Sequence, residues 1–139
     1  GFCLVGSEMC IRDRNSTGQE ILNKLGQCIK IEESKFDAFT SIFGAGPAYI
    51  SYLGNLLSEI ALSNGFENPE PLIRDLLKGT YEIHNFANKP SFNEIKSMVA
   101  SKGGVTEAAL KKIESSGMEE IWKSAIEDAI NQSKKLGDN

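Results

Sequence analysis

The stretch Ala100-Ser101-Lys102-Gly103-Gly104-Val105-Thr106-Glu107 lies between two amphipathic segments and ends where a helix is expected to begin. Its adjacent glycines allow positive φ and a close approach of the backbone to a ligand, because neither carries a Cβ atom. We expect Thr106 to be the N-cap, with Glu107 in the first turn at the positive end of the helix dipole. The stretch predicts either an anion-binding helix start suited to a small carboxylate or a plain Gly-Gly hinge between helices.

Apolar residues recur at helical spacing on both sides of this stretch, so we predict that the chain is helical from Ser34 onward. Ser34 and Ser91 are the expected caps of two of these helices. Asn64-Gly65 and Ser116-Gly117 are expected to end two others. The predicted helices cover residues 34–41, 47–63, 71–86, 91–100, 106–116 and 118–136.

The last predicted helix carries an apolar band that is wider than the narrow seam of a coiled coil. Such a band favours contact with two neighbours, one of which can be a second subunit; a buried core helix of a monomer is the alternative. The band consists of Met118, Ile121, Trp122, Ala125, Ile126, Ala129, Ile130 and Ser133.

A second glycine-rich loop, Gly44-Ala45-Gly46-Pro47-Ala48-Tyr49, precedes the longest apolar helix. Pro47 suits the first position of that helix, where a missing N–H costs nothing. Together with residues 36–40 and 101–110, this loop resembles pyrroline-5-carboxylate reductase. The resemblance runs from about residue 16 to residue 136, with mild departures at Ala100 and Val105.

The resemblance implies an all-α, multi-helix dimerisation domain like the 6-phosphogluconate-dehydrogenase-like C-terminal domain. It also implies a separate N-terminal dinucleotide-binding domain, for which this chain shows no fingerprint. The Gly44-Ala45-Gly46 triplet does not serve as one, because Tyr49 stands where the third glycine belongs and Pro47 lies inside the turn. We therefore expect the chain to be inactive alone.

The activity implied by the resemblance is the reduction of 1-pyrroline-5-carboxylate to L-proline with NADPH or NADH, in proline biosynthesis. The Thr106 hydroxyl would hydrogen-bond the ring nitrogen and is the catalytic candidate, while Lys102 would add only a favourable charge. Substrate binding would fall to Ser101, Gly103, Gly104, Val105 and Thr106. Cofactor contacts, at the nicotinamide end, would fall to Gly44, Ala45, Gly46 and Pro47.

The N-terminal third is expected to contribute little to this domain. Residues 15–33 would be the remnant of the dinucleotide-binding domain, with a helix over 19–25 and a strand over 28–31. Residues 1–14 are expected to be either non-native, adapter-like sequence, disordered segment, or native sequence from the missing domain. Residues 34–139 would form the helical dimerisation and substrate domain.

The composition argues against several classes of function and partner. The net charge is −4 and no basic cluster stands out, so nucleic acid is not an expected partner. No apolar run could span a bilayer, and three cysteines without metal-like spacing indicate neither zinc nor disulfides, which favours a reducing cytoplasm. His84, the only histidine, is expected on a polar face or in the core.

Two alternatives to the reductase assignment stay open at this point. The chain could be a non-catalytic helical dimerisation module, or the helical half of a β-hydroxyacid-dehydrogenase-like enzyme. The residues Ser101, Gly103, Gly104 and Thr106 favour the reductase. No lysine lies convincingly among apolar neighbours, as the catalytic lysine of the dehydrogenases would.

Overall fold

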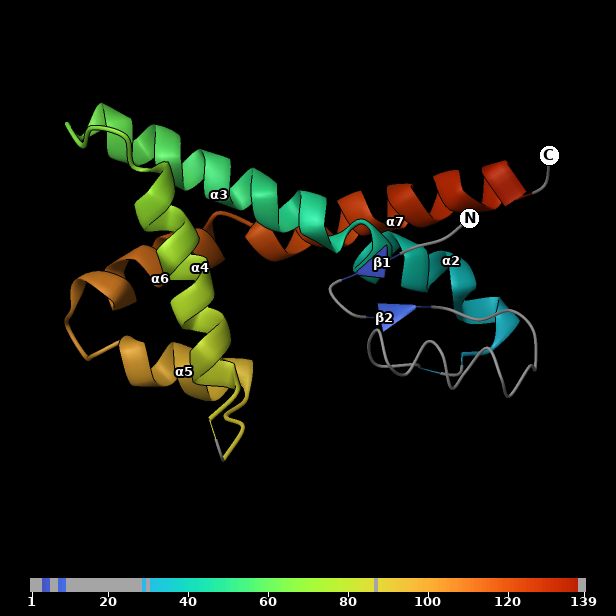
Figure 1. Cartoon of the computed structure of the whole chain (residues 1–139), viewed down its shortest axis with the longest axis horizontal. Coiled ribbons are helices and arrows are strands. Elements are labelled where there is room, and N and C mark those ends of the chain that lie inside the picture. Colours follow the sequence, from blue (N-terminus) through green and yellow to red (C-terminus); the bar gives the residue numbers. More distant parts are fainter. Residues whose placement is uncertain (1–3, 6–7, 10–28, 30, 87, 138–139) are drawn as a thin grey trace. The chain divides into compact units, whose positions relative to one another are not determined.

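A computed structural model describes residues 4–5, 8–9, 29, 31–86 and 88–137 of the chain. The chain forms two compact units, one made of residues 1–51 with 123–139 and the other of residues 52–122. Helices α3 (Gly46–Ser63) and α7 (Met118–Gly137) each contribute residues to both units (Figure 1). The expectation that the chain is helical from Ser34 onward is confirmed.

The first unit begins with two short strands, β1 (Leu4–Val5) and β2 (Glu8–Met9), which pair antiparallel with Leu4 opposite Met9. The predicted helix over 19–25 lies outside the described residues. The predicted strand over 28–31 is wrong where it can be checked, because Ile29 and Ile31 belong to no strand. A short strand without a neighbour to pair with is not stable.

The helix predicted over residues 34–41 is present but irregular. It starts as a 3-10 turn, η1 (Glu33–Lys35), continues as α2 (Phe36–Phe39), and ends as a π-helix, η2 (Thr40–Gly44). Ser34 is not its cap, since it lies inside the 3-10 turn and no side chain caps η1 or α2.

The packing of the first unit centres on the end of this irregular helix. Phe39 is 9% exposed, and its ring centroid lies 4.9 Å from that of Phe43. Ser133 Oγ on α7 donates a hydrogen bond to Asp37 Oδ1 at 2.7 Å. That bond ties the C-terminal half of α7 to α2.

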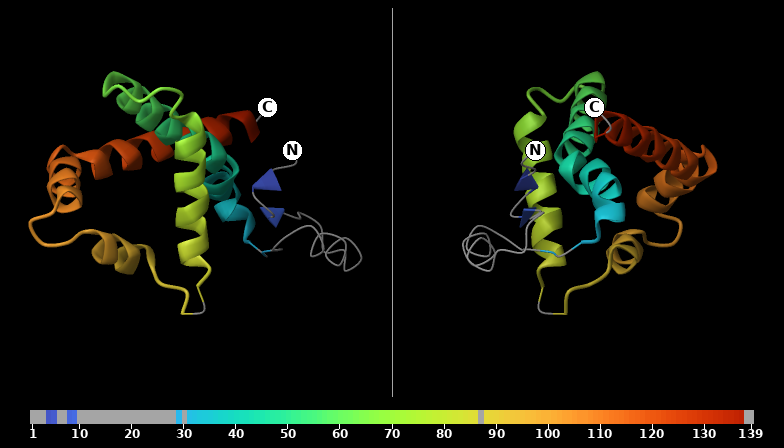
Figure 2. Two further views of the ribbon diagram at one scale, coloured as in Figure 1. Left: turned by 60° about the vertical axis from the view of Figure 1, so that its left-hand side comes forward. Right: turned by 90° about the vertical axis from the view of Figure 1, so that its right-hand side faces the viewer.

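In the second unit, α3 ends as predicted at Asn64-Gly65. Gly65 has φ of +86°, and the N–H of Phe66 donates to the carbonyl of Ala61 at 3.1 Å, which is the Schellman arrangement. The chain then forms α4 (Glu70–His84), α5 (Phe92–Val99) and α6 (Val105–Ser115) before α7 (Figure 2). Helix α4 packs on α3 at Gly54, where an added Cβ would lie 3.7 Å from Ile73.

Helix α5 begins with the predicted Ser91 cap, completed by Glu94. Ser91 Oγ accepts from the Glu94 N–H at 3.3 Å, and Glu94 Oε2 accepts from the Ser91 N–H at 2.7 Å. Hydrogen bonds to the Glu94 carboxylate, first from the Ser91 side chain and then from the Ser91 backbone, hold the pKa of that carboxyl below its ordinary value. An ion pair of 3.2 Å between Lys96 and Glu114 joins α5 to α6.

The apolar stripes predicted from sequence are poorly covered. Within the described residues, Phe39 is the only large apolar side chain that is buried, and Pro69 and Pro90 are the other buried apolar ones. Leu53 and Ile60 on α3 are 41% and 49% exposed, and Ile121 at the start of α7 is 62% exposed. A helical domain that exposes so much apolar surface is expected to pack against another protein surface.

Candidate functional site

The loop between α5 and α6 is a tight turn that needs its first glycine. The Gly104 N–H donates to the Ser101 carbonyl at 2.9 Å, and Gly103, at the third position of this turn, has φ of +74°. A turn with positive φ at that position favours glycine. Gly104 has φ of −83°, so the conformational freedom of glycine is used at Gly103 and not at Gly104.

Gly104 is needed for a different reason, which is steric. A Cβ at this position would lie 2.5 Å from Ser101 Oγ and 3.0 Å from the Ser101 carbonyl oxygen, whereas a Cβ at Gly103 would meet nothing within 4 Å. Gly104 is also the N-cap of α6. Its missing side chain therefore lets the Ser101 hydroxyl lie directly over the start of the helix.

The expected N-cap was wrong. Helix α6 begins at Val105, so Thr106 lies inside its first turn and no side chain caps the helix. Thr and Gly are about equally favourable as N-caps, so residue preference did not decide between Thr106 and Gly104, and the turn before α6 leaves no room for a side chain at Gly104.

The loop leaves three backbone donors open at the helix start. The N–H groups of Gly103 and Gly104 are used, because they donate to Glu107 Oε2 at 2.8 Å and to the Ser101 carbonyl. Those of Val105, Thr106 and Glu107 find no acceptor in the part of the chain that the structure describes, as is usual for the first helical residues. Together with Ser101 Oγ they form a candidate anion site.

The predicted substrate residues therefore lie in one continuous loop. Thr106 is half-buried, Lys102 is exposed and the Val105 side chain is 89% exposed. The contribution of Val105 to an anion site can only be its backbone N–H. Glu107 was not among the predicted site residues, although its position three residues after the N-cap is a signal for a contact with the backbone before the helix.

The second predicted loop, Gly44 to Pro47, belongs to the first unit and is mostly helical: Gly44 ends the π-helix and α3 begins at Gly46, so Pro47 is the second residue of α3 and not the first. The Ala45 N–H donates to the Thr40 carbonyl at 2.9 Å, and Tyr49 Oη donates to the Ser41 carbonyl at 2.9 Å. Single π-turns inside helices are often found at functional sites. A Cβ at Gly46 would meet nothing within 4 Å, so the described part of the chain gives no steric reason for glycine there.

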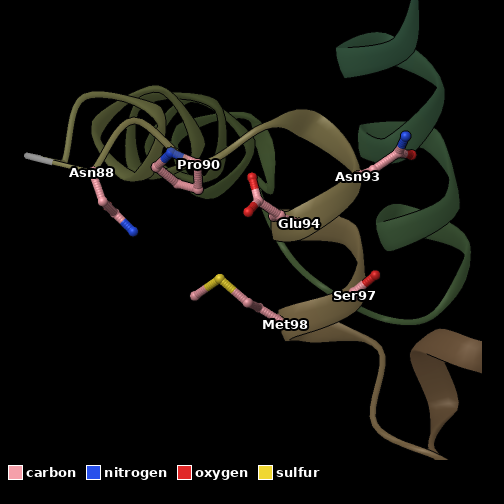
Figure 3. A pocket seen from close by; sticks show the side chains of 6 residues that line it. All are labelled: Asn88, Pro90, Asn93, Glu94, Ser97 and Met98. Atoms are coloured by element: carbon pink, nitrogen blue, oxygen red, sulfur yellow. The ribbon is translucent and has the colours of Figure 1, made fainter.

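A surface hollow of about 450 Å³ lies at the start of α5 (Figure 3). Its one charged group, Glu94, is already occupied by the capping bonds to Ser91. The other polar side chains of the lining do not point toward a common position, as the polar groups of a binding site do. The lining residues are Asn88, Pro90, Asn93, Glu94, Ser97 and Met98.

Other chemistry finds little support among the described residues. They contain no cluster of His, Cys, Asp and Glu that could hold a metal ion. His84 is half-buried and its ring centroid lies 4.4 Å from that of Phe92, which fits a packing role. In the described part of the chain, no helix has the length and apolar character to cross a membrane.

These observations define a class of protein, namely an all-helical domain with a candidate anion site at one helix start and exposed apolar faces that a partner surface could cover. The comparisons with known proteins identify it further. Residues 33–136 match the family described as pyrroline-5-carboxylate reductase dimerisation. The chain belongs to this family.

Individual relatives agree with the family assignment. The chain is 30% identical to pyrroline-5-carboxylate reductase of Aquifex aeolicus, over 89% of this chain and 47% of that protein. It is also 30% identical to the reductase of Kluyveromyces lactis, over 85% of this chain and 42% of the relative. The chain thus spans about half the length of the curated relatives it matches, and it matches their C-terminal part.

Solved structures confirm the fold. The pyrroline carboxylate reductase of Plasmodium falciparum, solved with NADP bound, matches with a TM-score of 0.79 at 26% identity, over 94% of this chain and 53% of that one. The Coxiella burnetii reductase matches with a TM-score of 0.80 at 26% identity, over 93% and 50% of the two chains. These matches support the reductase over the dehydrogenase alternative.

Proposed function

We propose that this chain is the substrate-binding and self-associating part of a reductase that converts 1-pyrroline-5-carboxylate to L-proline with NADPH or NADH. The observation that carries the proposal is the loop before α6, where Ser101 Oγ lies over a helix start with three open N–H groups. The proposal further rests on the reductases that resemble the chain, one of which was solved with NADP.

The substrate carboxylate would bind at this helix start. The N–H groups of Val105, Thr106 and Glu107 would donate to its oxygens, with the Ser101 hydroxyl as a fourth donor. The positive end of the helix dipole favours an anion at this place. Gly104 keeps the approach open because it carries no Cβ.

Thr106 would orient the ring of the bound substrate. Its hydroxyl would hydrogen-bond the ring nitrogen of the cyclic imine, while a hydride from the nicotinamide reaches the C=N carbon and a proton from water reaches the nitrogen. The pKa of an aliphatic hydroxyl is too high for efficient acid catalysis at neutral pH. We therefore assign Thr106 orientation and proton relay, and positioning supplies the rest of the rate.

The Gly44–Pro47 loop would contact the nicotinamide end of the cofactor. Gly46 has open space where its side chain would stand, and the described part of the chain gives no reason for its being glycine. An external group such as the nicotinamide supplies that reason. Most of the cofactor would be held by a dinucleotide-binding domain.

A second copy of the chain would cover the exposed apolar faces. Ile60 on α3 and Ile121 on α7 are about half exposed or more, which is unfavourable in water for so many apolar side chains. A dimerisation family provides the matching partner, namely the same surface on a second copy.

The proposal is tested by joining residues 15–139 to the dinucleotide-binding domain of a relative such as the Aquifex aeolicus reductase, which gives the joined enzyme. Replacing Thr106→Ala or Thr106→Val should lower kcat/KM for 1-pyrroline-5-carboxylate roughly 10- to 100-fold, the scale of a lost hydrogen bond to a polarised group. The measurement is the nicotinamide absorbance.

Thr80→Ala is the matched control. Thr80 lies on α4 in the same unit, and its exposed hydroxyl donates only to the Leu76 carbonyl of its own helix at 2.9 Å. This variant should keep full activity. Unchanged kcat/KM in both Thr106 variants would mean that the loop is a hinge and the proposed function is wrong.

A further inference from the structure

Glu107 makes a contact that ordinary helix capping does not explain. It is the third residue of α6, counted from the Gly104 N-cap. In a capping box the third residue accepts from the N–H of the N-cap itself, as Glu94 does from Ser91 in α5. In α6 the Gly104 N–H already donates to Ser101, and Glu107 accepts instead from the N–H of Gly103 at 2.8 Å.

This contact restrains the part of the loop that has the greatest freedom. Gly103 has no side chain and holds a positive φ of +74°, so little except hydrogen bonds opposes its rotation. The bond between Gly104 and Ser101 closes one side of the turn, and the bond from Gly103 to Glu107 closes the other. Together they keep Ser101 Oγ over the helix start.

The charge of Glu107 is partly compensated. Its Oε1 lies 3.4 Å from Lys111 Nζ on the next turn of α6, with 33% and 72% of the two side chains exposed. An exposed ion pair of this kind stabilises little by itself. It does reduce the repulsion that a free carboxylate would exert on an anion at the same helix start.

We propose that Glu107 is a positioning residue: by holding the Gly103 N–H, it sets the turn that presents Ser101 and the helix-start N–H groups to the substrate carboxylate. This inference rests on the proposed function, since it assumes that the loop binds a carboxylate. In this scheme the Glu107 side chain touches no substrate, and only the backbone N–H of Glu107 faces the carboxylate.

The test uses the whole chain, labelled with ¹⁵N, and L-proline as the probe. The dissociation constant is taken from the shifts of the Val105 and Thr106 amide signals as L-proline is added. Glu107→Ala should weaken binding about tenfold, the scale of one lost hydrogen bond to a charged group. Glu107→Gln keeps an oxygen that accepts from Gly103, so it should restore binding to nearly the original strength.

Glu94→Ala is the control for general helix capping. It removes a glutamate from the same position of a neighbouring helix, and should leave the dissociation constant unchanged. Equal weakening by Glu94→Ala and Glu107→Ala would overturn the inference, because a loss of helix stability would then explain both. Tighter binding by Glu107→Ala would overturn it as well, since Glu107 would then compete with the ligand.

The two proposals fail in different ways. If L-proline shifts the Val105 and Thr106 amides equally well in the original chain and in Glu107→Ala, only the role of Glu107 is wrong. If L-proline shifts neither amide in the original chain, the loop is not a carboxylate site, and the proposed function falls together with this inference.

Discussion

Replacing Gly104→Ala adds one carbon atom at the most crowded point of the loop. That carbon would lie 2.5 Å from Ser101 Oγ and 3.0 Å from the Ser101 carbonyl oxygen. The first distance is too short for any stable contact, so the Ser101 side chain must rotate away. The second is tight against the backbone, so the turn from Ser101 to Gly104 must open slightly.

The cost can be worked from these two adjustments. Forcing Ser101 from its preferred rotamer costs about 0.5–1.5 kcal/mol. Moving its hydroxyl from the helix start removes a hydrogen bond to a charged carboxylate, worth about 1.5–3 kcal/mol. Taken together, about 2–4.5 kcal/mol of transition-state stabilisation is lost, which lowers kcat/KM roughly 30- to 2,000-fold.

The assay is the kcat/KM of the joined enzyme for 1-pyrroline-5-carboxylate, with Gly65→Ala as the control. Gly65 has φ of +86° at the end of α3, so alanine there costs about 1 kcal/mol of stability without touching the loop. The circular-dichroism signal of both variants should stay helical. The loss of kcat/KM should appear in Gly104→Ala alone.

A double-mutant cycle with Ser101→Ala separates the two causes. In the Ser101→Ala background the hydroxyl is already absent, so adding Gly104→Ala should cost much less than it does in the original chain. Additive effects would refute the argument that Gly104 acts by making room for Ser101. A Gly104→Ala enzyme with unchanged kcat/KM would refute the site itself.

Two further predictions concern assembly and helix stability. Ile126→Glu places a charge at a half-buried position of the apolar band of α7 and should turn a dimer into monomers by light scattering. Gln132→Glu, an exposed site on the same helix, should leave the dimer intact. A dimer that survives Ile126→Glu would show that the interface lies elsewhere. Gly79→Ala should raise the unfolding free energy by about 0.5–1 kcal/mol, because Gly79 lies inside α4 with nothing within 4 Å of an added Cβ. A lower Tm in this variant would show that another copy of the chain approaches α4 at this point.

The long helices could be predicted because several independent signals agree on each. Residues 46–63 and 105–115 combine helical periodicity with glycine-containing stops, residues 118–137 carry a wide apolar band, and the Ser91 cap precedes a clear apolar pattern. The π-helix at Thr40–Gly44 could not be predicted, since it results from how the chain enters α3 and not from a local residue preference.

In the candidate loop, too, some features could be predicted from the sequence and others depend on the folded geometry. The sequence predicted either an anion-binding helix start or a plain hinge at Gly103-Gly104, and it predicted Thr106 as the N-cap. The preference for threonine over glycine as an N-cap is worth only about a few tenths of a kcal/mol, so the start of α6 is decided by the turn that forms only in the folded chain. The bond from Gly103 to Glu107 depends on the same turn and was missed for the same reason.

The two glycines of this loop are therefore not interchangeable. Gly103 supplies a positive φ and has empty space around it, so an alanine there would strain the backbone without blocking the helix start. Gly104 has an ordinary φ and no space, so an alanine there would displace the Ser101 hydroxyl without straining its own backbone. A plain hinge would need the freedom of the first but not the clearance of the second. The clearance at Gly104 brings a hydroxyl next to open N–H groups, and that is the property of a carboxylate site.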